Sequence, residues 1–450
     1  MKRARRANLF LRAVIDPVQA FFQLEAASGI LLMIAAVVAL VWANSPLGDA
    51  YRRLVSLDFN VAVGAREARF TLLQLVNDGL MTLFFFVVGM EIKRELVVGE
   101  LRAFNRAILP AIAALGGMVV PAVIYVAFNA GKPGVPGWGI PMATDIAFSI
   151  GVLTLVPKVP RALVVFLTAL AIFDDLGGIL VIAFFYGHGL HAWPLASALG
   201  VCAALFVLNR AGGRSWLPYF GLGLALWWLL HEGGVHATIA GVILGMAVPA
   251  RSGRTGREVL EDLHSYAGSL LGEKEDEDLE NEQILHIEEK LEDLEPPLNR
   301  FVHALHPYVA FAIVPVFALV NSGVSVRGMS LADLAQPIPA GTALGLFLGK
   351  QLGIFASTLG AVALGISPMP GDSGRLQLYG VSVVAGIGFT VALFIAALAF
   401  PNAPVALDQA KLGILLGSFV SALVGYAILR FASMSADTSH ASHVRGRRMS

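Results

Sequence analysis

The sequence predicts an all-α polytopic membrane protein, and composition is the first observation behind this prediction. Of 450 residues, 56% are hydrophobic and 14% are charged, whereas soluble chains carry about 25% charged residues. The mean hydropathy is +0.72. Apolar runs long enough to cross a bilayer, about 20 residues each, recur about twelve times along the chain. Short polar loops separate them, as expected for a bundle of transmembrane helices.

The predicted spans divide the chain into five parts. The spans are residues 28–45, 73–92, 106–129, 140–157, 162–185, 192–208, 216–231, 234–249, 304–323, 338–364, 376–400 and 408–431. The parts are an N-terminal segment at 1–27, spans 1–8 within 28–249, an acidic insertion at 250–303, spans 9–12 within 304–432 and a basic tail at 433–450.

Lysine and arginine predict the orientation, because cytoplasmic loops carry an excess of both. One side of the predicted bundle holds Lys2, Arg3, Arg5, Arg6, Lys93, Arg94, Arg102, Arg106, Lys158, Arg161, Arg210, Arg214 and the basic tail. The other side holds Lys132, Arg327, Lys411 and a few residues of 51–71. Both termini are therefore expected to be cytoplasmic. The basic N-terminus lacks a long apolar core, so no cleaved signal peptide is expected.

Residues 51–72 lie outside the spans on the external side. Apolar residues alternate there at Val55, Leu57, Phe59, Val61 and Val63, which is typical of a strand. We expect a small external β-hairpin, with a loop on the membrane surface as the alternative. An exposed hairpin edge can pair with a second copy, so a homodimer through residues 51–72 is expected.

The insertion combines dense negative charge with a helical pattern. Residues 273–295 contain twelve acidic residues and two lysines. Ile284, Ile287, Leu291, Leu294 and Leu298 recur at gaps of three and four, which predicts an amphipathic helix. A solvated cytoplasmic linker and a regulatory or partner-binding segment both fit this pattern.

Composition also excludes several classes of function. Cys202 is the single cysteine and the net charge is zero. An internal disulfide is therefore impossible, no redox or zinc motif is present, and nucleic acid is not expected as a partner. We expect no cofactor.

Two adjacent carboxylates lie in the middle of the fifth span. Asp174 and Asp175 are the sole charges between Ala162 and Phe185. A charge at the centre of a membrane helix costs about 2.5–3.5 kcal/mol, so such residues point to function. The alternative is an ion pair that pins helices together, although one such pair needs a single aspartate. Neighbouring helix positions lie about 100° apart, so one carboxylate can face an ion path while the other meets a partner.

Further polar groups lie at membrane depth in other spans. Thr144 and Asp145 lie in span 4, and Lys350 is the single charge of span 10. Three aspartates against one lysine leave an excess of negative charge that favours a cation. Carboxylate and hydroxyl oxygens are hard ligands, so a hard ion is expected rather than a soft transition metal.

Spans 4 and 11 are interrupted by residues that disfavour helix. Span 4 has Pro141 and Gly151, and span 11 has Gly380, Gly386 and Gly388. Such interruptions at matching positions predict broken helices in two inverted repeats, spans 3–5 and 10–12. Asp145 and Lys350 are candidates to offset the exposed helix ends. Alternatively, the glycines allow close helix packing.

Seven motifs resemble the NhaA-type Na+/H+ antiporters. They are NDGLMTLFFFVVGMEIKREL at 77–96, ATDIAFSIGVL at 143–153, LAIFDDLGGILVI at 170–182, GVHATIAGVILG at 234–245, HALHPYVAFAIVPVFALVNSGVS at 303–325, GLFLGKQLGI at 345–354 and GIGFTVALFIAALAF at 386–400. The resemblance covers about residues 20–432. It implies a twelve-helix secondary transporter of the bacterial inner membrane.

The resemblance also implies roles for individual residues. Na+ would bind at Asp174 and Asp175: Asp175 would alternately bind Na+ and H+, and Asp174 would join in the binding or pair with Lys350. Thr144 and Asp145 would complete the ion and proton site from the broken span 4. Groups linked to the cytoplasmic funnel and to pH regulation would be Asp78, Glu91, Glu95, His236, His303 and His306. One departure is Val302, where family members often carry an acid. Glu91 and Glu95 could instead be part of a salt-bridged helix end, and His236 a packed loop histidine.

The expected activity is electrogenic export of Na+ or Li+ in exchange for protons, for sodium and pH homeostasis. Histidine changes charge near pH 6.5, so activation toward alkaline pH is expected. A passive cation channel is the alternative, and an intramembrane aspartic protease is a further one. The protease needs a carboxylate dyad on two separate spans and a GxGD pattern, where this chain has GLFLGK.

Overall fold

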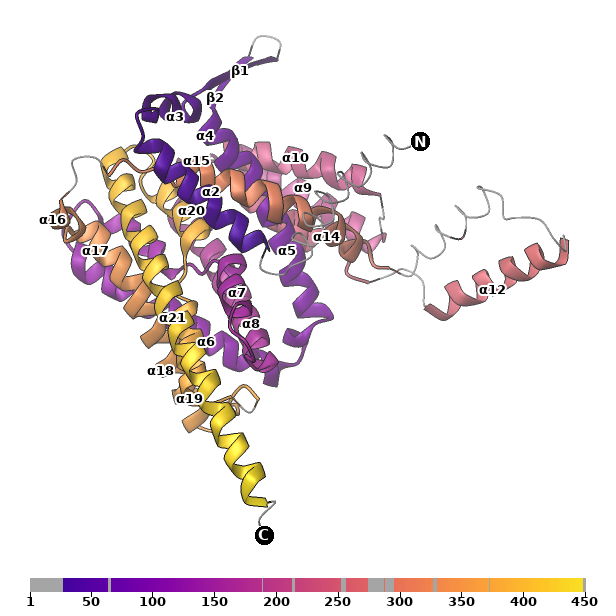
Figure 1. Cartoon of the computed structure of the whole chain (residues 1–450). Helices are drawn as coiled ribbons and strands as arrows, with labels where there is room; N and C mark the ends of the chain where they lie inside the picture. The colour runs from indigo at the N-terminus through magenta and orange to yellow at the C-terminus, as the bar shows by residue number, and fades with distance from the viewer. Residues whose placement is uncertain are drawn as a thin grey trace, which may run out of the picture. The chain divides into compact units, whose positions relative to one another are not determined.

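The computed structural model describes residues 27–63, 66–187, 189–212, 215–251, 256–273, 287, 295–326, 330–371 and 373–447 (Figure 1). Among them, seven helices are long and apolar enough to cross a membrane, or up to nine if each of two bent pairs is one span. The seven are Leu72–Val97, Phe104–Asn129, Arg161–Phe185, Ala192–Arg210, Pro297–Asn321, Pro337–Ala363 and Pro404–Met434. The predicted class, a helical multi-pass membrane protein, is confirmed. The count of twelve spans stays a prediction.

The chain forms two compact units. The first unit contains α2 (Ala27–Ala43), α3 (Gly48–Val55), β1 (Asp58–Val63), β2 (Arg66–Thr71), α4 (Leu72–Gln74), η1 (Leu75–Leu80), α6 (Phe104–Asn129), η3 (Val135–Met142), α7 (Ile146–Thr154), α8 (Arg161–Phe185), α15 (Val314–Asn321), α16 (Leu331–Leu334), α17 (Pro337–Leu344), η5 (Gly345–Gly349), α18 (Lys350–Ala363), α19 (Arg375–Val384), α20 (Phe389–Ala399) and α21 (Pro404–Arg447).

The second unit contains α5 (Met81–Val97), η2 (Glu100–Arg102), α9 (Ala192–Arg210), α10 (Trp216–Glu232), α11 (Ile239–Ala247), α12 (Gly256–Glu273) and α14 (Pro297–Tyr308). The short π-helix η4 (Val309–Ile313) joins α14 to α15.

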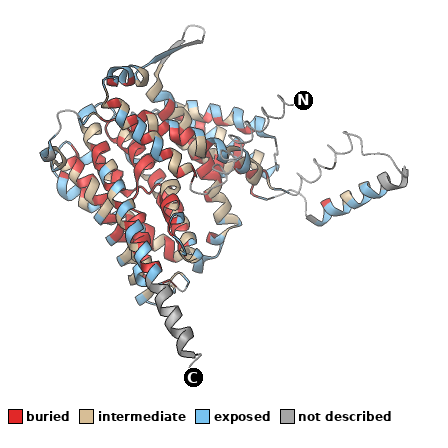
Figure 2. Ribbon diagram, in the orientation of Figure 1, coloured by how far each residue is buried: buried red, intermediate tan, exposed pale blue. Residues whose placement is uncertain are grey.

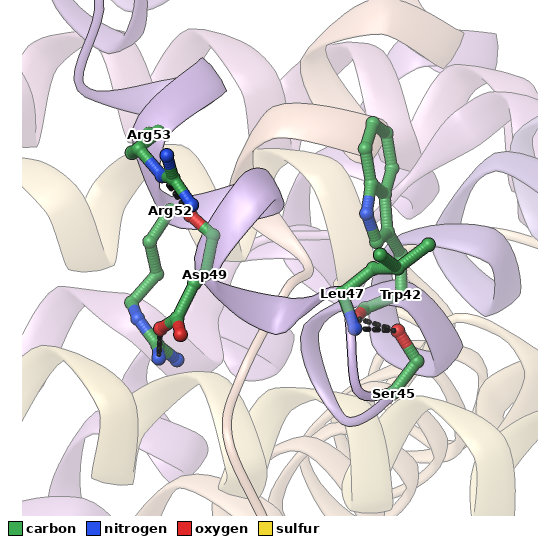
Figure 3. A network of polar contacts seen from close by, with 6 residues as sticks. All are labelled: Trp42, Ser45, Leu47, Asp49, Arg52 and Arg53. Atoms are coloured by element: carbon green, nitrogen blue, oxygen red, sulfur yellow. Dashed lines mark hydrogen bonds and ion pairs between the residues drawn. The ribbon is translucent and has the colours of Figure 1, made fainter.

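Residues 51–72 begin with the end of a helix and not with a strand. Helices α2 and α3 meet at 117°. Figure 3 shows the turn, where the Ser45 hydroxyl donates to Trp42 O at 2.8 Å and accepts from Leu47 N at 3.1 Å. Asp49 forms an ion pair with Arg52 on the exposed side of α3.

The prediction that Val55 begins a strand was wrong. The reason lies in Tyr51, which is 4% exposed and donates its hydroxyl to Leu319 O at 2.8 Å and Val320 O at 2.9 Å. The last carbonyls of a helix lack partners within it, so the end of α15 binds Tyr51 and holds α3 helical. The hairpin itself is present but shorter than predicted. Strands β1 and β2 pair antiparallel with Phe59 opposite Phe70, and they extend past α3 in Figure 1.

Both predicted broken helices are present. Helix η3 ends at Met142 and α7 begins at Ile146, while α19 and α20 are separated by residues 385–388 and bent by 44°. Close backbone approach explains the glycines of the second break. A Cβ atom on Gly386 would lie 2.5 Å from Leu346 O, and one on Gly388 would lie 2.8 Å from Ala143 O. These two glycines therefore both interrupt the helix and allow its backbone to pack closely against neighbouring segments.

Long helices flank each break and position it. Helices α6 and α8 flank η3 and α7 in sequence, and α18 and α21 flank α19 and α20. Helices α6 and α18 pack backbone to backbone, since a Cβ on Gly353 would lie 2.2 Å from Gly116 O. Each of these four helices carries buried residues (Figure 2). The interrupted segments are thus flanked by long helices that are partly buried.

Within the second unit, α5 and α11 are also in close contact. A Cβ on Gly241 would lie 2.2 Å from Thr82 O. Lys93 donates its ammonium group to Met246 O at 2.8 Å and Val248 O at 2.5 Å. A cation at the carbonyl end of a helix is favourable, so Lys93 caps α11.

The insertion differs from its predicted pattern. Helix α12 covers residues for which no helix was predicted, and its described side chains are mostly exposed (Figure 2). Most of the predicted amphipathic helix, including Ile284, Leu291 and Leu294, lies outside the described residues. Leu298 belongs to α14 instead, where it is fully buried and donates its N–H to Pro249 O at 3.1 Å. Proline at the first helical position favours a start there, and Pro297 begins α14.

Candidate ion-binding site

The centre of the site is a buried ion pair between α8 and α18. Asp174 is 2% exposed and Lys350 is fully buried. The Lys350 ammonium group donates to Asp174 Oδ2. The positive charge therefore stabilises the ionised form of a carboxylate that lies inside the membrane-spanning bundle.

Thr144 connects this pair to the second broken helix. Its hydroxyl lies 2.7 Å from Asp174 Oδ2 and 2.9 Å from Ala385 O. A hydroxyl has one proton to donate and can also accept. Thr144 can thus donate to an ionised Asp174, or accept from a protonated Asp174 while donating to Ala385 O. The bond network can adapt to both protonation states of Asp174.

The two adjacent carboxylates of α8 have different surroundings. Asp174 Oδ1 is buried and has no hydrogen-bond partner among the residues that the structure describes, which is costly for a polar atom. Asp175, the next residue of α8, is 5% exposed and also interacts with its surroundings. Carboxylate and hydroxyl oxygens are hard donors, the chemical type that suits Na+ or Li+.

Asp145 joins the two broken helices. Its Oδ1 accepts from Phe148 N at 3.0 Å, at the start of α7. Its Oδ2 accepts from Thr390 N at 3.1 Å and from the Thr390 hydroxyl at 2.5 Å, at the start of α20. One carboxylate therefore caps two helix N-termini, where the helix dipole favours negative charge. This is the helix-end position expected of Asp145, whereas Lys350 bonds to Asp174.

Lys350 follows a π-helical turn. Residues Gly345–Gly349 form η5, and the Lys350 N–H donates to Gly345 O, five residues back. Such turns occur often at functional sites, and they rotate the following side chain relative to a regular α-helix. The sequence pattern contained no sign of this turn.

Sequence reasoning missed two hydroxyl residues at the second break. Thr390 donates to Asp145 as described, and the Ser418 hydroxyl accepts from Phe389 N at 3.2 Å. Ser418 thus satisfies an N–H group at the start of α20, and Thr390 binds the carboxylate that caps this helix. A threonine directly after the Gly-Ile-Gly-Phe run was the available signal, because hydroxyl residues favour helix starts.

Comparisons with known proteins identify the family of this chain. The family model described as Na+/H+ antiporter 1 matches residues 19–429. The chain belongs to this family.

Relatives of the Na+/H+ antiporter 1 family match nearly the whole chain. Na(+)/H(+) antiporter NhaA 1 of Myxococcus xanthus is 59% identical over 426 residues, which are 94% of this chain and 95% of that protein. Na(+)/H(+) antiporter NhaA of an Anaeromyxobacter species is 58% identical, covering 95% of this chain and 94% of that protein. The solved sodium proton antiporter MjNhaP1 from Methanocaldococcus jannaschii at pH 8 shares the fold, with a TM-score of 0.50 and 12% identity. The match covers 94% of this chain and 98% of the MjNhaP1 chain.

The remaining predicted residues of this family member form separate pairs. In the second unit, His306 Nε2 lies 3.9 Å from Glu91 Oε1, His303 Nε2 lies 3.8 Å from Glu295 Oε1, and His236 Nδ1 lies 3.1 Å from Thr238 Oγ1. Glu95 lies 4.0 Å from Arg94 and accepts from Glu100 N at 3.1 Å. Asp78 lies in the π-helical turn η1 of the first unit. The structure thus brings Glu91 and His306 together.

Proposed function

We propose that this chain exports Na+ in exchange for protons at Asp174 and Asp175. The observation that carries the proposal is the buried Asp174, bonded to Lys350 and Thr144 beside both broken helices. Membership of the Na+/H+ antiporter 1 family makes the chain a secondary transporter and not an enzyme. Neither the channel nor the protease alternative has support from these relatives.

Competition for the same oxygens explains the exchange. A carboxyl group removed from water favours its neutral form, and a nearby cation favours the ionised form. Na+ and H+ therefore exclude one another at Asp174 and Asp175. The Thr144 hydroxyl can donate to Asp174 when this carboxylate is ionised, and to Ala385 O when Asp174 is protonated. If the site opens alternately to each side, it carries Na+ one way and protons the other.

Charge transfer follows from the number of titrating groups. If both aspartates, or one aspartate and Lys350, change protonation in each cycle, two protons move against one Na+. Exchange is then electrogenic, and the membrane potential contributes to driving Na+ out. Li+ has similar hard-ion chemistry and serves as a second substrate.

The setting of the protein completes the proposal. The relatives named above come from bacteria, and the basic loops favour an inner-membrane protein with both termini in the cytoplasm. The hairpin β1–β2 has free edges on both strands within the described residues, and an edge of this kind pairs readily with another strand. We therefore propose a homodimer joined through residues 51–72, surrounded by lipid and requiring no cofactor.

Reconstituted vesicles test the exchange. The vesicles are acidified inside and loaded with an amine dye that is quenched by the pH gradient, and then Na+, Li+ or K+ is added outside. We expect dequenching with Na+ and Li+ but not with K+. Folded protein that moves no protons with any cation across the pH range would refute the proposal. Current without proton coupling would instead establish a channel.

An imposed membrane potential tests whether the exchange is electrogenic. In the same vesicles, it should change the initial rate of Na+-driven proton movement. An unchanged rate would exclude electrogenic exchange.

The pH dependence provides a prediction for the second unit. Glu91→Ala removes the carboxylate beside His306, and His236→Ala removes the imidazole beside Thr238. Because histidine and carboxylate pairs change charge with pH, we expect each variant to shift the pH of half-maximal exchange. Initial rates measured between pH 6 and 9 should show a shift of about 0.5 pH unit or more. His264→Ala on the exposed helix α12 is the control. Unmoved profiles in both variants would contradict a regulatory role.

A further inference from the structure

The residue that follows Lys350 makes a buried connection between two helices. Gln351 is 3% exposed. Its side-chain Nε2 donates to Phe347 O at 2.8 Å, within the π-helical turn η5. Its Oε1 accepts from the Tyr379 hydroxyl of α19 at 2.5 Å. The amide thus joins the turn that precedes Lys350 to the first half of the broken span 11.

Tyr379 is itself held in place by packing. Its ring meets Phe355 of α18 edge to face, with ring centres 5.2 Å apart and an interplanar angle of 73°. Edge-to-face contact is a favoured arrangement of aromatic rings. The Phe347 carbonyl can only accept a hydrogen bond, so the amide nitrogen of Gln351 faces it. The amide oxygen is then left to accept from the Tyr379 hydroxyl.

Two points along α19 connect to the same ion pair. Near its C-terminal end, Ala385 O lies within reach of the Thr144 hydroxyl, which contacts Asp174. Nearer its start, Tyr379 bonds to Gln351, the neighbour of Lys350. We call this closed set the α19 circuit; it comprises Tyr379, Gln351, Lys350, Asp174, Thr144 and Ala385. A displacement of α19 therefore acts on both partners of the ion pair.

We propose that the Tyr379–Gln351 contact positions Lys350 on Asp174 and links their pairing to the position of α19. This proposal rests on the proposed exchange at Asp174. Gln351 stabilises the turn that orients Lys350, and Tyr379 stabilises the amide of Gln351. Movement of α19 that breaks the contact loosens Lys350 from Asp174, so Na+ or a proton can bind the carboxylate. Tyr379 and Gln351 are positioning residues that do not touch the ion.

Few charged groups act on Lys350 besides its partner. Asp174 bonds to it and Asp175 acts on it electrostatically, both from α8. Gly117 of α6 faces its side chain and brings no charge. Among residues whose side chains are described, the elements packed on α18 and η5 carry these other titratable or charged groups: Arg106 and Tyr125 on α6, Arg375 on α19, and Asp408, Lys411, Tyr426 and Arg430 on α21.

Tyr379→Phe tests the proposal, since it keeps the ring on Phe355 and removes the hydroxyl. A less firmly held Lys350 competes less well with protons for Asp174. We expect the pH of half-maximal Na+-driven exchange to move about 0.5 unit to the alkaline side, as the loss of one hydrogen bond implies. The apparent KM for Na+ at alkaline pH should fall, while kcat should change less than KM. Gln351→Asn, with a shortened amide, should shift the profile in the same direction.

A double variant and a control make the test specific. If both residues act through one contact, Tyr379→Phe should add no further shift to Gln351→Leu. Tyr426→Phe removes a hydroxyl from α21 outside the α19 circuit and should leave the profile unchanged. Wild-type profiles in Tyr379→Phe and Gln351→Asn, or additive shifts in the double variant, would overturn the proposal. Absence of Na+-driven exchange in the wild-type protein would instead refute the exchange itself.

Discussion

Replacing Asp175 with asparagine is expected to abolish coupled exchange while leaving a folded protein. An amide cannot bind and release a proton in this pH range, and it lacks the charge that attracts a cation. The Asp174–Lys350 bond does not involve the side chain of Asp175 and stays in place. The vesicle assay should therefore show no Na+-dependent or Li+-dependent dequenching. Unfolding temperature should stay close to that of the wild-type protein.

Asp174→Asn should lose transport for the same reason but should also lose stability. It leaves the fully buried Lys350 without its charge partner. Removing one member of a buried ion pair costs about 3–5 kcal/mol. Adding Lys350→Met to Asp174→Asn removes the uncompensated charge and should restore much of the stability without restoring transport. Full exchange by either aspartate variant would contradict the assigned site, and equal stability of all variants would contradict the ion-pair reasoning.

Asp145→Ala is expected to destabilise both broken helices at once. The substitution removes the acceptor for two backbone N–H groups and one hydroxyl. Hydrogen bonds to a charged group contribute about 1.5–3 kcal/mol each, and their sum is not additive. We expect a loss of about 3 kcal/mol or more in the free energy of unfolding, with exchange reduced because α7 and α20 lose their common anchor. Denaturant unfolding in detergent and the vesicle assay measure the two effects.

Graded variants separate capping from other effects of Asp145. Asp145→Asn keeps an oxygen acceptor, so this variant should lose less free energy of unfolding than Asp145→Ala. Thr390→Val removes only the hydroxyl donor and should cost least. Asp333→Ala is the matched control, because Asp333 also accepts from a backbone N–H, that of Ser330 at 2.7 Å, but lies on the short helix α16. If Asp333→Ala loses as much free energy of unfolding as Asp145→Ala, this would contradict the role of Asp145 as the cap of two helices.

Local properties of the sequence were sufficient for the fold class and for the breaks. An apolar run of membrane length is visible in any window of about 20 residues, and a charge within it is equally visible. Glycines at 386 and 388 marked the second break in the same way. Val55 showed the limit of such reasoning: the alternation that predicted a strand is overruled by Tyr51, whose hydroxyl binds carbonyls of α15 more than 260 positions away.

By itself, the sequence determined that this is a helical multi-pass membrane protein with ionisable groups at membrane depth and two interrupted spans. The tertiary structure alone decided that Asp174 is the aspartate bonded to Lys350, that Asp145 caps two helices, and that Thr390 and Gln351 support these groups. Asp174 and Lys350 are 176 positions apart, and Asp145 and Thr390 are 245 apart. Burial and interruption of a helix are properties of one segment. Which buried groups meet depends on how the helices pack, and here also on a π-helical turn that reorients a side chain.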